Sequence, residues 1–333
     1  MHSVSKNRRT APRHGHRPTD PLRRAFRISQ NGPMQNLVDA MRERVVVLDG
    51  GLATELERRG NDLADALWSA RLLVDGPDEI RAAHRAYFRA GAEVATTASY
   101  QASFAGFDRL GADAPTMLRR SVLLARGARD EHGSGWVAAS VGPYGAVLAD
   151  GSEYRGDYGL TVAELRRFHR PRMQLLADCG ADLLAVETIP CLAEVEAVLA
   201  ELDELEIPAW LSLTCGGTRT RAGEAAADAF TMARDCPALI AVGVNCTSPS
   251  DVRALVRTAA EHSGKPAVAY PNSGETWDAA RHTWTGTAAF AAGEVNMWID
   301  DGARLVGGCC RVGPAEIAAL AVTVRRRLAQ RST

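Results

Sequence analysis

The sequence predicts a single (β/α)8 barrel, an α/β fold of the TIM-barrel type, and three observations lead to it. The chain has 333 residues and 46% apolar content, enough to bury one large core. Eight short apolar, β-branched runs lack polar alternation, which is typical of parallel strands buried on both faces. A helical pattern follows each run, and eight such units favour a closed barrel over a doubly wound sheet. No G-x-G-x-x-G motif follows the first run, which weakens the dinucleotide-binding alternative.

The strands and helices are expected to alternate along the chain. Proline at a first helical position and glycine after a last one mark several helix ends. The predicted strands cover residues 44–49, 93–97, 136–141, 182–187, 209–214, 239–244, 267–270 and 303–306. The predicted helices cover residues 34–44, 77–90, 114–131, 161–178, 192–202, 224–235, 286–301, and two further segments that begin at 249 and 314.

The first 33 residues differ in composition from the rest. They carry eight basic residues against the single acid Asp20, with no apolar periodicity. We therefore expect residues 1–33 to form a disordered basic tail and residues 34–330 to form the barrel domain. Two alternatives stay open for this stretch. Translation could start at Met34, or the stretch could be an organelle transit peptide, since it is rich in Arg and poor in acids.

Charge and cysteine content limit the partners and the compartment. The formal net charge is −1, so the chain has no general attraction to nucleic acid or to a membrane surface. No apolar run approaches the ~20 residues of a membrane-spanning helix. The seven cysteines are an odd number spread through a large chain, which indicates a reducing, cytoplasmic environment without a disulfide framework.

Three cysteines fall at predicted strand ends. Cys309 and Cys310 are adjacent, follow the last strand, and cannot easily pair with each other in a disulfide. Cys246 follows the sixth strand and also precedes a helix. In a (β/α)8 barrel the carboxyl ends of the strands meet at the active-site face, so these thiols are expected close together. Three thiolates suit Zn²⁺, and three protein ligands leave a fourth position open, as in catalytic zinc sites.

Other strand ends supply polar groups to the same face. A zinc-bound thiol is deprotonated and its sulfur stays nucleophilic, so the substrate is expected to be a thiol. Two carboxylates, Asp49 and Glu187, would hold a substrate ammonium group, and the backbone N–H groups of Gly50 and Gly51 would take a carboxylate. An amino acid with a thiol side chain fits this set. The remaining polar candidates at strand ends include Thr96, Tyr100 and Asn245.

The chain resembles the zinc-dependent homocysteine S-methyltransferases, in the branch that uses S-methylmethionine or S-adenosylmethionine. The resemblance runs from about Met34 to Leu328, with the motifs in family order. The motifs are Asp49–Glu55 (DGGLATE), Thr96–Ser103 (TTASYQAS), Ser140–Gly145 (SVGPYG), Asp150–Asp157 (DGSEYRGD), Glu187–Pro190 (ETIP), Gly243–Cys246 (GVNC), Tyr270–Gly274 (YPNSG) and Gly307–Cys310 (GGCC).

The resemblance implies roles for individual residues. Cys246, Cys309 and Cys310 would be the zinc ligands. Asp49 and Glu187 would bind the homocysteine amino group, and Gly50 and Thr96 would help with its carboxylate; Asn245 also belongs to the expected substrate site. Tyr100 and the Asp150–Tyr158 loop would lie near the methyl donor. The implied reaction is one in-line methyl transfer from a sulfonium donor to the zinc-bound homocysteine thiolate, giving methionine.

Three other functions are weighed against this one. Betaine as the donor is disfavoured because Thr188 stands where the betaine-using relatives often have Tyr. Zinc-assisted hydrolysis would be favoured by histidine ligands, and no predicted strand ends in one. A non-catalytic thiol-based zinc or redox sensor, in which Cys246 pairs with Cys309 on oxidation, stays open from the residues alone.

Overall fold

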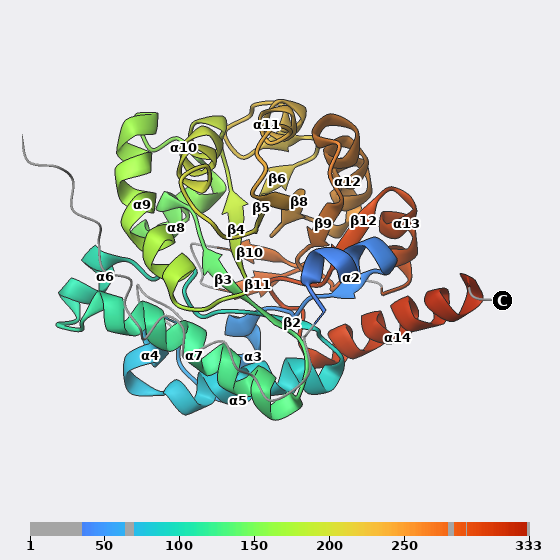
Figure 1. Cartoon of the computed structure of the whole chain (residues 1–333), viewed down its shortest axis with the longest axis horizontal. Coiled ribbons are helices and arrows are strands. Elements are labelled where there is room, and N and C mark those ends of the chain that lie inside the picture. The colour runs from blue at the N-terminus through green and yellow to red at the C-terminus, as the bar shows by residue number, and fades with distance from the viewer. Residues whose placement is uncertain (1–34, 64–69, 279–282, 291, 332–333) are drawn as a thin grey trace, which may run out of the picture. The chain divides into compact units, whose positions relative to one another are not determined.

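Eight parallel strands form a barrel in this computed structural model, which describes residues 35–63, 70–278, 283–290 and 292–331 (Figure 1). The sheet order is β1-β12-β9-β8-β5-β4-β3-β2, and a parallel bridge between Leu48 and Val94 closes the ring. The eight strands are β1 (Val46–Val47), β2 (Val94–Thr96), β3 (Trp136–Val141), β4 (Leu183–Ile189), β5 (Ala209–Leu213), β8 (Leu239–Asn245), β9 (Ala267–Tyr270) and β12 (Ala303–Val306). The predicted (β/α)8 barrel is confirmed.

Helices surround the barrel, and short elements fill the connections. Two 3-10 turns, η2 (Ser152–Tyr154) and η3 (Ala292–Glu294), and two small hairpins lie in the loops. The hairpins are β6 (Cys215–Gly216) with β7 (Arg219–Thr220), and β10 (Thr276–Asp278) with β11 (Thr283–Thr285). The helices are α2 (Leu37–Glu43), α3 (Leu52–Arg58), α4 (Leu72–Asp75), α5 (Pro77–Ala90), α6 (Phe104–Arg109), α7 (Ala114–His132), α8 (Tyr144–Leu148), α9 (Val162–Asp178), α10 (Leu192–Leu202), α11 (Ala226–Met232), α12 (Pro249–Ser263), α13 (Val295–Asp300) and α14 (Pro314–Arg331).

The apolar residues divide into an inner and an outer core. Alternate strand residues such as Val46, Trp136 and Trp210 fill the barrel interior, whereas their neighbours pack against the helices. The α2 residues Leu37 and Met41 belong to the inner cluster, so α2 covers one end of the barrel. Both faces of each strand are therefore buried, which explains why the strands read as unbroken apolar runs. None of the described helices is long and apolar enough to cross a bilayer.

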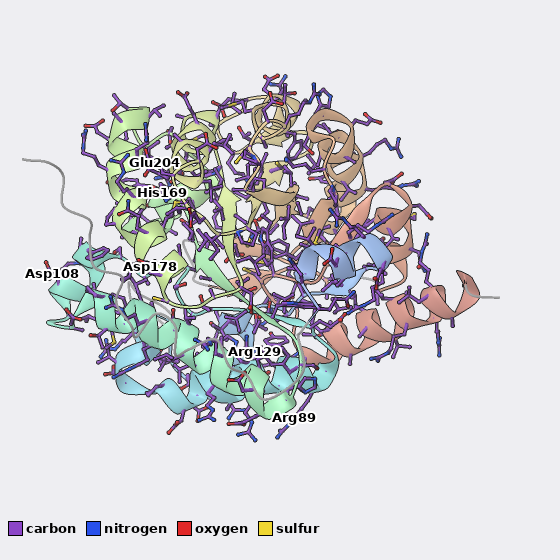
Figure 2. All side chains as sticks on the ribbon, viewed as in Figure 1. Arg89, Asp108, Arg129, His169, Asp178 and Glu204 are labelled. Atoms are coloured by element: carbon purple, nitrogen blue, oxygen red, sulfur yellow. The ribbon has the colours of Figure 1, made fainter. Side chains whose placement is uncertain are left out.

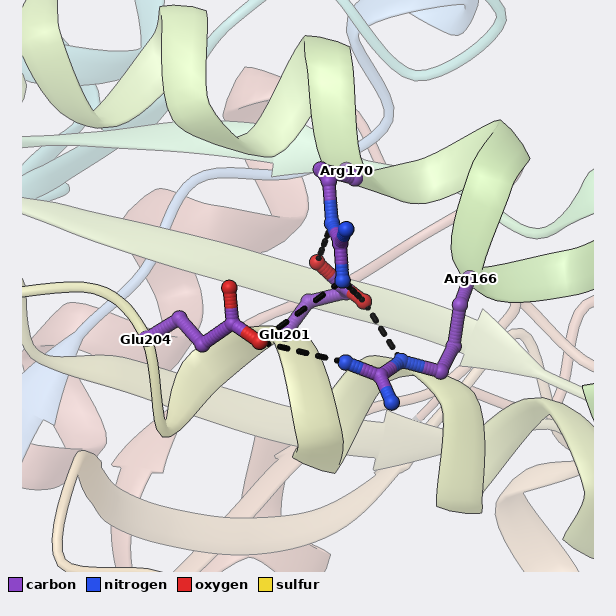
Figure 3. A network of polar contacts seen from close by, with 4 residues as sticks. All are labelled: Arg166, Arg170, Glu201 and Glu204. Carbon is purple, nitrogen blue, oxygen red and sulfur yellow. Dashed lines mark hydrogen bonds and ion pairs between the residues drawn. The ribbon is translucent and has the colours of Figure 1, made fainter. Parts of the chain in front are cut away.

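Charged side chains lie on the outer helices. Arg89 in α5, Asp108 in α6 and Glu204 in the turn after α10 are exposed (Figure 2). Between α9 and α10, Glu201 is 2% exposed and accepts hydrogen bonds from Arg166 Nε at 2.7 Å and Arg170 Nε at 2.8 Å (Figure 3). A buried carboxylate paired with two guanidinium groups fixes how these two helices pack, and removing one partner would leave a buried charge.

One predicted helix differs from the structure, and four short helices were not predicted. The helix expected at 286–301 begins only at Val295, after η3. Ala289 and Phe290 instead donate their backbone N–H groups to the Ser273 carbonyl oxygen, at 2.6 and 2.7 Å, so this segment lies along another loop. The short helices α3, α4, α6 and α8 were not predicted because four to seven residues carry too little apolar periodicity. The expected tail, residues 1–33, lies outside the described residues.

Gly243, in the middle of β8, is a point of close backbone approach. A Cβ atom there would lie 1.9 Å from the Val268 carbonyl oxygen of β9. That oxygen belongs to the backbone, so it cannot rotate away as a side chain would. We predict that Gly243→Ala lowers the free energy of unfolding by about 2 kcal/mol, as measured by urea denaturation.

Gly293→Ala is the matched control. Gly293 is exposed, and no heavy atom lies within 4 Å of the Cβ position there. The control should change the free energy of unfolding by less than about 0.5 kcal/mol. Equal stability of the two variants would contradict the close approach of β8 and β9.

Candidate functional site

A partly open cavity of about 120 Å³ lies at the carboxyl ends of the barrel strands. Its described lining contains carboxyl, thiol, hydroxyl and amide groups but no Lys, Arg or His side chain. All nine residues singled out from the sequence as site residues line it. The lining consists of Asp49, Gly50, Gly51, Leu52, Ala53, Thr54, Thr96, Thr97, Tyr100, Glu153, Tyr154, Glu187, Thr188, Asn245, Cys246, Tyr270, Gly308, Cys309 and Cys310.

Three thiols of the cavity lining form one cluster. The Cys246 Sγ atom lies 2.6 Å from Cys309 Sγ and 3.9 Å from Cys310 Sγ, and all three sulfurs lie within 4.8 Å of one another. Cys246 directly follows β8, while Cys309 and Cys310 follow β12. The loop after β9 orients this pair, because Cys309 N donates to the Pro271 carbonyl oxygen at 2.7 Å.

The pKa values of the thiols are shifted in opposite directions. Hydrogen bonds from Cys309 and Cys310 hold the pKa of Cys246 well below its usual range. The hydrogen bonds to Cys246 in turn raise the pKa of Cys309. Three thiolates this close together would repel one another without a cation, so the cluster favours metal binding.

The donor set fits zinc. In a tetrahedral site with Zn–S bonds of about 2.3 Å, neighbouring sulfurs lie about 3.8 Å apart. The Cys246–Cys310 sulfur separation of 3.9 Å matches this value. The sulfurs of Cys246 and Cys309, which lie 2.6 Å apart, would have to move apart to bind the same ion. Thiolates are also the soft ligands that zinc accepts readily. Among the described residues, these three cysteines are the group with metal-ligand spacing.

Asp49 follows β1 and is fixed by Thr96 at the end of β2. Thr96 donates its backbone N–H to Asp49 Oδ2 at 2.7 Å and its hydroxyl to Oδ1 at 2.9 Å. Burial raises the pKa of the Asp49 carboxyl to about 7, although the hydrogen bonds from Thr96 act in the opposite direction. The Thr96 hydroxyl proton is thus used to orient Asp49, a contact that the sequence did not predict.

Glu187 lies in β4 and is held by Ser140 on the adjacent strand β3 and by Tyr270 on the more distant strand β9. The Ser140 hydroxyl hydrogen-bonds to Glu187 Oε1, and the Tyr270 hydroxyl donates to Oε2 at 3.0 Å. Burial raises the pKa of Glu187 to about 8 against the effect of these bonds, and the charge of Cys246 adds to the rise. Two buried carboxyls with raised pKa values indicate a cavity that binds a positively charged group.

Asn245 links the ends of β4 and β8. Its Oδ1 accepts hydrogen bonds from Thr188 N at 2.7 Å and Ser212 Oγ at 2.8 Å, and its Nδ2 donates to Thr188 Oγ1 at 2.7 Å. Thr188 has a φ of 62° and the neighbouring Cys246 a φ of 45°, in the left-handed region that is unfavourable for both residues. The Asn245 amide therefore holds a strained backbone in place, which is a positioning role beside its place in the lining.

The glycines after β1 allow two loops to meet. A Cβ atom at Gly51 would lie 2.5 Å from the Cys309 carbonyl oxygen, and one at Gly50 would lie 2.3 Å from the Val312 carbonyl oxygen. The Gly51 N–H donates to the Val312 carbonyl oxygen at 2.9 Å. It is therefore engaged within the protein, which leaves Gly50 as the backbone candidate for a substrate carboxylate.

Glu153 is a third acidic residue in the lining. It belongs to the Asp150–Tyr158 loop that was expected near the methyl donor, but the sequence did not single out this residue within the loop. It lies in η2, is 7% exposed, and has one buried carboxylate oxygen, Oε2, without a hydrogen-bond partner. The half-buried rings of Tyr100 and Tyr154 line the same cavity. A loop position has no periodicity to predict burial, so the motif at 150–157 was the available signal for this residue.

Comparison with known proteins identifies close relatives. The sequence profile of the family described as homocysteine S-methyltransferase matches residues 46–324. Homocysteine S-methyltransferase YbgG of Bacillus subtilis is 43% identical over 310 residues, covering 88% of this chain and 98% of that protein. A homocysteine S-methyltransferase of Escherichia coli is 45% identical over 309 residues, covering 88% and 99%. The metallated structure of the Escherichia coli homocysteine methyltransferase MmuM matches with a TM-score of 0.76 and 42% identity, over 84% of this chain and 96% of that one.

The raised carboxyl pKa values generate a prediction about pH. In the unfolded chain Glu187 ionises near its ordinary pKa, whereas in the folded protein it stays protonated up to about pH 8. Stability is therefore lost as pH rises from about 5 to 8. The Gln side chain carries no charge to bury, so Glu187→Gln should gain at least about 1 kcal/mol of stability relative to the wild type over this range.

Chemical denaturation of the ligand-free protein at several pH values measures this difference. Glu196→Gln, on the exposed face of α10, is the control and should follow the wild type throughout. If the difference in the free energy of unfolding between Glu187→Gln and the wild type does not change with pH, the buried carboxyl is already ionised at pH 5.

Proposed function

This chain belongs to the homocysteine S-methyltransferase family, and from that premise we propose that it transfers a methyl group from a sulfonium donor to homocysteine, forming methionine. The observation that carries the proposal is the meeting of three thiols with the buried carboxyls of Asp49 and Glu187 in one cavity. S-methylmethionine is the first donor that we propose, and S-adenosylmethionine is the second.

We propose zinc as the cofactor, held by Cys246, Cys309 and Cys310. Support comes from the soft donor set, from the sulfur spacing, and from the metallated form of the Escherichia coli relative. Three protein ligands leave one position for the substrate thiol. When bound, zinc would lower the pKa of that thiol and keep its sulfur nucleophilic.

Asp49 and Glu187 suit the ammonium group of homocysteine. Both carboxyls are buried and lie in a lining without a described cationic side chain. An ammonium group beside them would favour their ionised forms, so binding should release protons near pH 7 to 8. Thr96, Ser140 and Tyr270 orient the two carboxyls before the ligand arrives, which reduces the reorganisation needed on binding.

The chemical step needs alignment more than proton transfer. A bond forms between the homocysteine sulfur and the methyl carbon while the bond from that carbon to the donor sulfur breaks. The electron pair stays on the donor sulfur, which becomes a neutral thioether. No proton moves at the carbon, so the residues act by positioning the two sulfurs in line. The aromatic rings of Tyr100 and Tyr154 line the cavity and suit the donor cation before transfer.

We also propose a cytoplasmic location and small-molecule substrates. All seven cysteines are free thiols, which fits a reducing compartment.

Replacement of a proposed ligand tests the metal role. Cys309→Ser should reduce bound zinc from about one ion per chain to a small fraction, because a hydroxyl is a poor zinc ligand. Methyl transfer should fall by at least about 100-fold, since even changes around the ligands of such sites cost about 10 to 100-fold. Metal analysis and methionine quantification with each donor measure the two effects.

Cys179→Ser is the matched control. The Cys179 thiol lies outside the cavity lining and donates to the Leu175 carbonyl oxygen at 2.9 Å, a bond that Ser can also make. This variant should keep zinc and activity. Transfer by zinc-free protein would contradict the proposed cofactor. Zinc binding with reversible Cys246–Cys309 oxidation, but no methyl transfer from either donor, would favour the sensor function.

A further inference from the structure

The three carboxyls of the cavity differ in how the protein satisfies them. Both oxygens of Asp49 accept hydrogen bonds from Thr96, and both oxygens of Glu187 have hydroxyl partners. Glu153 Oε2 is buried with no partner among the described residues. A buried acceptor without a donor is unfavourable, and native proteins rarely keep one without a reason.

The fold places Glu153 in the cavity by a close backbone contact. A Cβ atom at Gly145, in α8, would lie 2.4 Å from Glu153 N, so the glycine lets η2 pack directly on α8. The nearby Arg155 makes no hydrogen bond or ion pair with Glu153, although its charge acts to lower the pKa of that carboxyl. Its guanidinium donates to Ser152 Oγ at 2.7 Å and forms ion pairs with the exposed Asp150 and Asp157, each at 3.6 Å.

Glu153 lies close to the other donor-side candidates. Its charge contributes to the raised pKa values of Tyr100 and Tyr154, although burial is the main cause. Burial also raises the pKa of Glu153 to about 7, with smaller contributions from Cys246 and Asp150. A ligand that brings a cation to this carboxyl would both ionise it and satisfy it.

The chemistry of the missing partner limits what the ligand can be. Oε2 needs a hydrogen-bond donor, and a sulfonium centre carries only carbon substituents. A quaternary ammonium group has no N–H either. A primary ammonium group supplies both the N–H and the charge.

The change of charge during the reaction also favours an ammonium group as the partner of Glu153. The sulfonium charge disappears during transfer, so a carboxylate bound to it would stabilise the ground state more than the transition state. An ammonium charge persists throughout and can be bound without that penalty.

We propose that Glu153 binds the α-ammonium group of the methyl donor and thereby selects sulfonium donors that are amino acids. This inference rests on the proposed methyl transfer and adds a specificity residue to it. Asp49 and Glu187 then serve the acceptor, and Glu153 serves the donor.

A comparison of two donors tests the assignment. S-methylmethionine carries an α-ammonium group, whereas dimethylsulfoniopropionate has the same dimethylsulfonium centre and a carboxylate but no N–H. The zinc-loaded wild-type chain should prefer S-methylmethionine in kcat/KM by at least about 100-fold. Glu153→Gln should reduce that preference by at least about 10-fold. The loss should fall mainly on KM for S-methylmethionine, with KM for homocysteine unchanged within about twofold.

Several outcomes separate this inference from the function it rests on. Glu196→Gln should keep the wild-type preference, and Glu153→Asp, which retains the charge, should keep more of it than Glu153→Gln. An unchanged preference in Glu153→Gln, an equal loss with both donors, or a loss carried by KM for homocysteine would overturn the role of Glu153. Absence of methionine from the wild type with every donor would overturn the proposed function instead. Zinc content and thermal unfolding of each variant confirm that the fold is intact.

Discussion

The cavity gathers six acidic groups without a cationic side chain in its described lining, and much of the local structure depends on this imbalance. Three carboxyls and three thiols lie at the ends of strands or in the loops that follow. Burial alone would keep most of them protonated. Cations brought from outside, a metal ion and ammonium or sulfonium groups, would let them ionise and would bind where the charge is needed. The acidic groups of the lining have no cationic side chain to balance them, which indicates that the ligands are cations.

Such a cavity has to hold its shape before the ligands bind, and the barrel provides this through contacts between strand ends. Asn245, the residue before Cys246, makes two hydrogen bonds to Thr188, and the backbones of Thr188 and Cys246 are both in the left-handed region. The loop after β9 holds Cys309 from the other side. The carboxyl-bearing and the sulfur-bearing strands are therefore linked by one side-chain amide. This linkage explains why an asparagine stands directly before a proposed metal ligand.

The sequence predicted the barrel and most of the site because both depend on local patterns. Buried parallel strands read as apolar runs, and a polar residue at the end of a run must lie at the active-site face. Contacts between segments that are distant in the sequence leave no comparable pattern in it. The burial of Glu153 depends on Gly145, and the strain at Thr188 on Asn245, so neither could be inferred from spacing. The helix expected at 286–301 begins only at Val295, because residues 289 and 290 donate their backbone N–H groups to the Ser273 carbonyl oxygen instead of to a helical turn.

The central claim is that Cys246, Cys309 and Cys310 bind one zinc ion and leave a position for the substrate sulfur. X-ray absorption spectroscopy of the zinc-loaded protein, with and without homocysteine, tests it most directly. Three sulfur ligands at about 2.3 Å and one lighter ligand should become four sulfurs when homocysteine binds. A zinc environment of nitrogen and oxygen ligands, or one that homocysteine leaves unchanged, would contradict the account.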